Sequence, residues 1–72
     1  MENRQYFRPT VNEVYTNKNG SQYRCLSVKD GFNAEMIHTV SKWRFEAWGC
    51  QMFDNGTIEW DGSTGGYFDE EK

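Results

Sequence analysis

The sequence contains no long apolar run. None of its apolar stretches approaches the roughly 20 residues that a membrane-spanning helix needs, and the mean hydropathy is −0.94. The first ten residues are polar and lack the apolar centre of a signal peptide. We therefore expect a cytoplasmic protein with no membrane partner.

Positive charge is also scarce. Of 72 residues, 8 are Lys or Arg and 11 are Asp or Glu, which gives a net charge of −3. Modules that bind nucleic acid usually carry clustered cations, because each phosphate contact needs one. The charge balance argues against such a module, and a small barrel that binds RNA or DNA is kept only as an alternative.

Residues that ligate metals or act as nucleophiles are few. The chain has two cysteines, Cys25 and Cys50, and one histidine, His38. These are too few ligands for a structural zinc site, and no C-x-x-C pair occurs. Small secreted domains usually carry more disulfides, so we expect free, partly buried thiols rather than a Cys25–Cys50 bridge. His38 is interpreted as a ring at the edge of the core.

No catalytic motif is present. Glu59 and Asp61 flank Trp60, and paired carboxylates can act on sugars. Alternate residues on a strand also give an ordinary solvated face, and we favour that interpretation. We predict that the chain is not an enzyme and that it uses no cofactor or metal.

Aliphatic residues are few, whereas aromatic residues are abundant. The sequence has one Leu, two Ile and four Val, against five Phe, four Tyr and three Trp. Each buried aromatic ring removes roughly 150–250 Å² from water, so the rings must supply most of the core. Twelve rings exceed what so small a core can hold, and some of them must be partly exposed.

Turn dipeptides divide the chain at regular intervals. Asn19-Gly20, Asp30-Gly31, Asn55-Gly56 and Asp61-Gly62 are strong turn signals. Short segments rich in Val, Thr, Tyr, Phe and Trp lie between them, which is typical of a β-meander. The predicted strands are residues 11–16, 22–28, 32–40, 43–48, 57–60 and 67–68, with 50–53 as a short strand or a connecting arch.

Alternation predicts which side chains face inward. In residues 32–40 the mainly apolar set is Phe32, Ala34, Met36, His38 and Val40. In residues 43–48 the inward set is Trp43, Phe45 and Ala47. Trp48 falls on the polar side of that strand and is therefore a candidate for an exposed ring.

These elements predict an all-β fold. We expect a small antiparallel meander of five to six strands in a single domain at 11–68, after an N-terminal arm at 1–10 and before an acidic tail at 69–72. Two architectures fit. An SH3-like barrel would remove exposed strand edges within one chain, whereas a strongly curled sheet would pair with a second copy. We favour the barrel.

The exposed aromatic and charged residues predict a binding surface. Exposed Trp and Tyr with nearby Arg are typical of interface hot spots, and stacking on a nucleobase uses the same residues. Acidic side chains, chiefly Glu35, Glu46, Glu59 and Asp61, could also compete for a basic nucleic-acid groove on a partner. The predicted partner-binding residues are Trp48, Trp60, Arg24, Arg44, Glu46, Glu59 and Asp61.

Several stretches resemble one group of proteins. They are Val14-Tyr15-Thr16-Asn17 with Asn19-Gly20, then Tyr23-Arg24-Cys25-Leu26, then residues 54–61 and Ser63-Thr64-Gly65-Gly66. Together they resemble small uncharacterised β-rich proteins of phages and prophages of Gram-positive bacteria. In that group a His follows the Trp-rich strand, where this chain has Cys50. The resemblance carries over no site residues. It implies an accessory gene on a mobile element, acting in the host cytoplasm, and such genes often encode inhibitors of host defence.

Two functional hypotheses follow from these features. The first is a non-enzymatic inhibitor that binds a host protein, such as a CRISPR effector or another defence nuclease. The second is an oligomer that sequesters a nucleotide signal, with Tyr or Trp stacked on the base and Arg24 or Arg44 on a phosphate. A homo-oligomer is required by the second hypothesis and compatible with the first.

Overall fold

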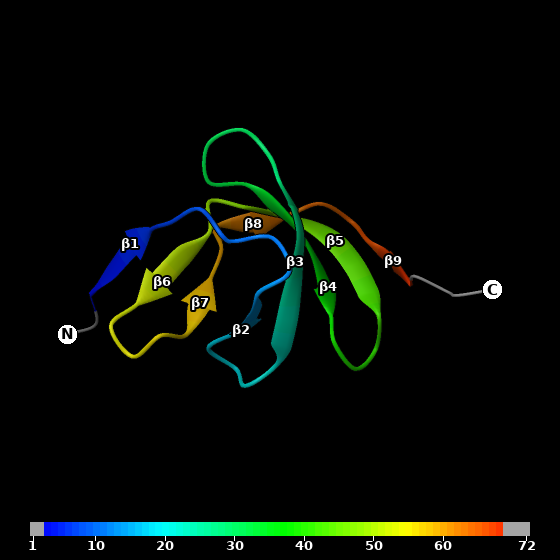
Figure 1. Cartoon of the computed structure of the whole chain (residues 1–72), viewed down its shortest axis with the longest axis horizontal. Coiled ribbons are helices and arrows are strands. Elements are labelled where there is room, and N and C mark those ends of the chain that lie inside the picture. The colour runs from blue at the N-terminus through cyan, green and yellow to red at the C-terminus, as the bar shows by residue number, and fades with distance from the viewer. Residues whose placement is uncertain (1–2, 69–72) are drawn as a thin grey trace.

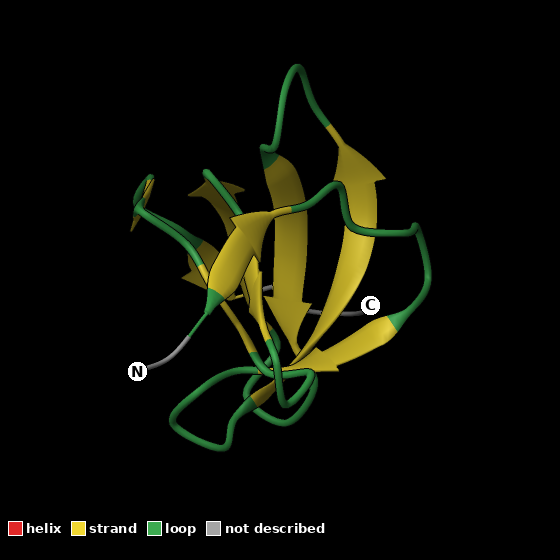
Figure 2. Cartoon of the chain, turned by 90° about the vertical axis from the view of Figure 1, so that its left-hand side faces the viewer, coloured by secondary structure: helices red, strands yellow, loops and turns green. Residues whose placement is uncertain are grey.

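The computed structural model describes residues 3–68 and contains nine β-strands in that range (Figure 1). No helix occurs in the described part of the chain, as the colouring of Figure 2 shows. The strands are β1 (Arg4–Tyr6), β2 (Val14–Thr16), β3 (Gln22–Val28), β4 (Ala34–His38), β5 (Trp43–Trp48), β6 (Gln51–Phe53), β7 (Ile58–Glu59), β8 (Gly62–Ser63) and β9 (Tyr67–Phe68).

The strands form two antiparallel sheets. The larger sheet has the order β2-β3-β4-β5-β8, with β9 also paired to β5, and the smaller sheet has the order β1-β6-β7. In Figure 1 the smaller sheet lies on the left and the larger one on the right. A single parallel bridge between Asn17 and Ile58 connects them. The all-β, antiparallel fold is confirmed. The nine strands of residues 3–68 exceed the predicted five to six, and the two open sheets do not confirm the closed SH3-like barrel.

The β2–β3 hairpin shows why the dipeptide Asn19-Gly20 forms a turn, as predicted. Gly20 has φ +97°, a left-handed conformation that glycine adopts without steric cost. The Asn17 side-chain oxygen accepts from the Asn19 N–H at 3.0 Å, and the Asn19 oxygen accepts from the Ser21 N–H at 2.9 Å. Asn side chains therefore hold the turn that sets the register Tyr15↔Tyr23.

The alternation in β4 and β5 is largely confirmed. Ala34, Met36, Phe45 and Ala47 are buried. The inward assignment is wrong for Phe32 and Val40, which are 43% and 83% exposed, because β4 covers only residues 34–38 and both lie in the flanking turns.

His38 lies where the sequence predicts, at the edge of the core. Its ring packs edge-on against Tyr23, with centroids 5.1 Å apart. Its Nδ1 accepts hydrogen bonds from the N–H groups of Val40 and Ser41 at 3.2 and 3.0 Å. The histidine therefore holds the β4–β5 turn, a structural role.

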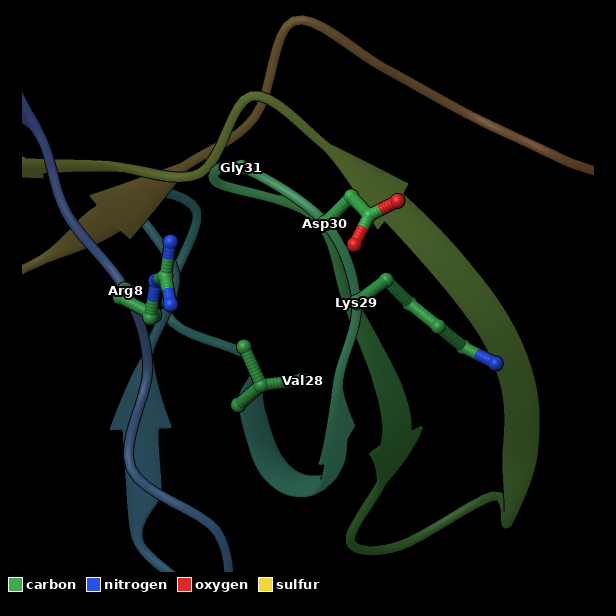
Figure 3. A pocket seen from close by; sticks show the side chains of 5 residues that line it. All are labelled: Arg8, Val28, Lys29, Asp30 and Gly31. Atoms are coloured by element: carbon green, nitrogen blue, oxygen red, sulfur yellow. The ribbon is translucent and has the colours of Figure 1, made fainter.

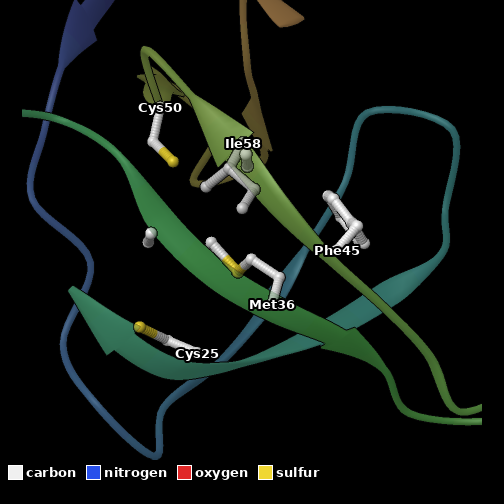
Figure 4. Packing of buried hydrophobic residues seen from close by; sticks show 7 residues of the cluster. Cys25, Met36, Phe45, Cys50 and Ile58 are labelled. Carbon is white, nitrogen blue, oxygen red and sulfur yellow. The ribbon is translucent and has the colours of Figure 1, made fainter. Parts of the chain in front are cut away.

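The core lies between the two sheets. Its buried members are Cys25, Ala34, Met36, Phe45, Ala47, Cys50 and Ile58 (Figure 4). Both cysteines are free and fully buried, so the thiols are more deeply buried than predicted. Burial, and secondarily the neighbouring Cys25, raises the pKa of Cys50 to about 11.

Two segments differ from the predicted organisation. Within residues 1–10, which we expected to form an arm, β1 pairs with β6 from Arg4↔Phe53 to Tyr6↔Gln51. Strand β8, at a predicted turn, pairs with the end of β5. The predicted acidic tail at 69–72 lies outside the described residues. Residues 3–68 contain no helix that could span a membrane.

Candidate interaction surface

The two faces of the larger sheet have different environments. The inner face carries Cys25, Met36 and Phe45 and packs toward the smaller sheet through Cys50 and Ile58. The opposite face, here called the outer face, consists of the side chains that alternate with these. Along β3, β4 and β5 the side chains of the outer face are half-buried or exposed, and none of them is buried.

The strand register arranges the outer face in rows. Arg24 lies opposite Ile37, Ile37 opposite Arg44, and Arg44 opposite Tyr67. In the next row Ser27 lies opposite Glu35, and Glu35 opposite Glu46. Neighbouring strands are about 4.8 Å apart, so these seven side chains form one continuous patch.

Glu35 and Arg44 form the ordered centre of this patch. Arg44 Nε lies 2.7 Å from Glu35 Oε2, and the side chains are 30% and 24% exposed. The Ser27 hydroxyl donates to the other oxygen of Glu35 at 3.3 Å. The hydrogen bond from Arg44 is the main cause that lowers the pKa of Glu35. The Arg44 guanidinium also lies 5.9 Å from the centre of the Tyr67 ring, close enough for a cation–π contact.

Glu46 makes an unfavourable pair within the same patch. It stands directly opposite Glu35 across the β4–β5 register, and like charges in this position destabilise a sheet. The positive charges of Arg44 and Lys29 both lower the pKa of Glu35.

Exposed aromatic rings flank the ordered centre. Trp48 ends β5 opposite Gly62 and is 43% exposed. A Cβ at position 62 would lie 3.5 Å from Cε3 of Trp48, so the indole covers that glycine. Tyr67, at the other end of the patch, is 54% exposed. Arg24 is exposed as well, and its Nη1 donates to the Asn12 carbonyl at 2.8 Å.

The structure therefore brings together four of the seven predicted residues. Arg24, Arg44, Glu46 and Trp48 share the outer face. Glu35, which we expected among the acidic side chains that could compete for a basic groove, belongs to the same patch. Tyr67 also belongs to it and was not predicted. Tyr67 had no comparable signal, because its two-residue strand is too short to show a period.

Trp60 does not lie on that surface. Its ring packs 5.2 Å from both Tyr23 and Phe45, against the core cluster. Trp60 is half-buried, because the connection between β7 and β8 turns its side chain toward the inner face. A role for Trp60 in binding a partner stays a prediction. Glu59 lies in the smaller sheet opposite Gln51.

Asp61 belongs to a separate cluster where the two sheets meet, here called the Gly49 corner: Tyr6, Phe32, Gly49, Gln51 and Asp61. The Tyr6 hydroxyl donates to Asp61 Oδ2 at 2.8 Å, and Gln51 Nε2 donates to Oδ1. The first bond is the main cause that raises the pKa of Tyr6. Tyr6 also stacks on Phe32, with ring centroids 5.4 Å apart.

An open groove lies beside the Gly49 corner. The groove has a volume of about 640 Å³ and is lined by Arg8, Val28, Lys29, Asp30 and Gly31 (Figure 3). Figure 3 shows the Lys29 side chain extending away from Arg8 on the other side of the loop. The two cations therefore do not converge on one point, as a phosphate would require.

Charge is evenly divided over the described part of the chain. Residues 3–68 contain seven Asp or Glu and seven Lys or Arg, so the net charge of −3 comes from residues outside this range. The body of the domain is therefore not an acidic surface. Its acidic side chains alternate with cations, as on the outer face. Within the same range no cluster of His, Cys, Asp and Glu could hold a metal ion.

No protein-family model matches the chain, and no curated protein or solved structure matches it either. The resemblance to phage and prophage proteins therefore stays a prediction.

Proposed function

We propose that the chain is a non-enzymatic binding domain that recognises a protein partner through its outer face. The observation that carries this proposal is a partly exposed sheet face on which an ordered Arg44–Glu35 pair lies between two exposed rings, Trp48 and Tyr67. Trp, Tyr and Arg are the residues most enriched at the energetic centres of protein interfaces.

Two further features support a protein partner. Glu46 is unfavourable for the sheet because it faces Glu35, and a residue that opposes folding is expected at functional positions. The patch is also organised before binding, since Glu35 is held by both Arg44 and Ser27. A preorganised surface loses less conformational entropy when it binds.

The kind of partner is proposed from the sequence resemblance. An accessory protein of a phage or prophage would act on a host defence nuclease or effector in the host cytoplasm. The neutral body of the domain favours recognition by aromatic and paired polar contacts over mimicry of a nucleic acid. The expected target surface is therefore mixed in charge.

The experiment measures inhibition and folding on the same variants. The chain is produced in a Gram-positive host with an active CRISPR system, and phage plating is compared for Trp48→Ala, Tyr67→Ala and Val40→Ala. Removing a hot-spot ring costs about 2 kcal/mol or more, so the first two variants should weaken target binding at least about tenfold. Val40→Ala is the matched control, because Val40 is exposed and lies in a turn outside the outer face.

If both aromatic variants inhibit as well as wild type and unfold at the same temperature, the outer face is not the surface that binds the partner. The nucleotide hypothesis is addressed by light scattering and melting with cyclic and ADP-ribose-type nucleotides. A symmetric oligomer that a nucleotide stabilises by about 1.4 kcal/mol, at tenfold excess over Kd, would support the nucleotide hypothesis in place of a protein partner. A salt-dependent shift with short oligonucleotides would instead support the nucleic-acid alternative.

A further inference from the structure

The carboxylate of Asp61 is exposed, and no ion pair joins it to a cation of residues 3–68. Within residues 3–68 its side-chain partners are the Tyr6 hydroxyl and the Gln51 amide, both of them neutral donors. The described ion pair of this molecule, Arg44–Glu35, lies on the outer face. The negative charge at the Gly49 corner is therefore held in place but not neutralised.

The local backbone fixes the position of this carboxylate. Gly49 has φ +66°, and a Cβ built on it would lie 2.6 Å from Asp61 Oδ2. The Asp61 N–H donates to the Trp48 carbonyl at 2.8 Å, and the Gly49 N–H donates to Asn33 Oδ1 at 3.0 Å. Glycine at position 49 leaves the space that the carboxylate occupies.

The hydrogen-bonding capacity of Asp61 is only half used. An ionised carboxylate offers about four acceptor positions, two on each oxygen. Tyr6 occupies one position on Oδ2, and Gln51 occupies one on Oδ1. One position on each oxygen remains, and a guanidinium can bind the two oxygens of a carboxylate with two parallel N–H bonds.

An aromatic platform adjoins the carboxylate. Tyr6 and Phe32 stack with an interplanar angle of 27°, and they are 53% and 43% exposed. Tyr6 touches both Phe32 and Asp61, so ring faces and carboxylate belong to one site. Planar guanidinium groups stack on aromatic faces, whereas the compact lysine ammonium does so less effectively.

We propose that the Gly49 corner receives a single arginine side chain of the protein partner, with Asp61 as the paired anion and the Tyr6–Phe32 stack beside the guanidinium. This inference names a contact of the proposed interaction and rests on it. Its test needs only the isolated protein, so the two can fail separately.

The neighbouring charges limit the ligand to one cation. Arg4 lies over the Phe53 ring, 6.0 Å from its centre, and lowers the pKa of Tyr6 by its charge. Arg8 lines the adjacent groove. A polybasic segment would bring several cations close to these two arginines, so a single arginine side chain fits this site better.

The test is an NMR titration with capped amino acids. N-acetyl-L-arginine amide is added to the ¹⁵N-labelled chain in the millimolar range, and N-acetyl-L-citrulline amide, its uncharged isostere, is the matched control. The arginine probe should give saturable shifts at the amides of Gly49 and Asp61, and the citrulline probe should not. Equal shifts with both probes, or none with either, would overturn the proposal.

Three variants separate the contributions. Asp61→Asn removes the charge and should abolish the arginine shifts. Phe32→Ala removes half of the platform without touching the carboxylate and should weaken binding about twofold to fivefold. Asp54→Asn changes an exposed carboxylate in the β6–β7 turn and should leave binding unchanged. If Asp61→Asn fails to fold, unchanged binding by Phe32→Ala or a loss in Asp54→Asn refutes the site.

Discussion

At the scale of single residues, Glu35 carries the electrostatics of the outer face. It accepts from Arg44 and Ser27, and it faces Glu46 on the neighbouring strand. Its pKa is lowered because the ionised form is the one that these donors stabilise. A depressed carboxyl pKa means that the folded protein binds this proton less readily than the unfolded chain does.

The stability contributed by Glu35 should therefore depend on pH. It is fully present above the unfolded pKa of about 4.3 and is lost as pH falls through the lower folded value. Because the pair is partly exposed, its contribution should be under about 1 kcal/mol. Urea unfolding of wild type and Glu35→Gln should differ near neutral pH and converge in acid. Parallel curves for wild type and Glu35→Gln would contradict the assignment.

At the scale of elements, the two candidate tryptophans have opposite surroundings. Trp48 ends β5 on the outer face, where it covers a glycine. Trp60 packs on Tyr23 and Phe45 and partly encloses the core. One ring is available for binding, and the other contributes to folding.

Alanine at these two positions should separate the roles. Trp60→Ala should cost roughly 2–4 kcal/mol, somewhat less than a fully buried ring. That is most of the stability of a domain this small. Trp48→Ala should change the free energy of unfolding by less than about 1 kcal/mol. Chemical denaturation followed by circular dichroism measures both, and similar losses in the two variants would contradict these placements.

Sequence reasoning recovered the elements whose signals are local. The strand at 43–48 matches β5, the strand at 22–28 matches β3, and the alternation correctly buried Met36 and Phe45. It failed where pairing partners are distant in the chain. Residues 4–6 carry no strand pattern of their own, and only β6, some 50 positions later, makes them a strand. The Tyr6–Asp61 contact depends on the same pairing.

At the scale of the whole molecule, a small core encloses two thiols. Cys25 comes from the larger sheet, and Cys50 lies on the segment between β5 and β6. Both are fully buried, and burial raises the pKa of each thiol. The cost of ionising them applies only to the folded protein, since the unfolded chain exposes both thiols to water.

Stability should consequently fall in alkali. A folded pKa above the unfolded value gives a contribution that is complete below the unfolded pKa and is lost as pH rises through the folded one. For Cys50 this range runs from the ordinary 9.0 to about 11. Thermal unfolding of Cys50→Ala should show a shallower loss of Tm than wild type over this range, despite a lower Tm at neutral pH. Identical slopes would contradict the shift.

The Gly49 corner also depends on the formation of both sheets during folding. Its residues come from four separate stretches of the chain: Tyr6, Phe32, Gly49 with Gln51, and Asp61. The hairpins between β2 and β5 close short loops, whereas β1 meets β6 across most of the chain, and longer loops cost more entropy to close. A chain that has formed only the larger sheet has not yet brought Tyr6 to Asp61. The contact between Tyr6 and Asp61 therefore forms only when both sheets have formed.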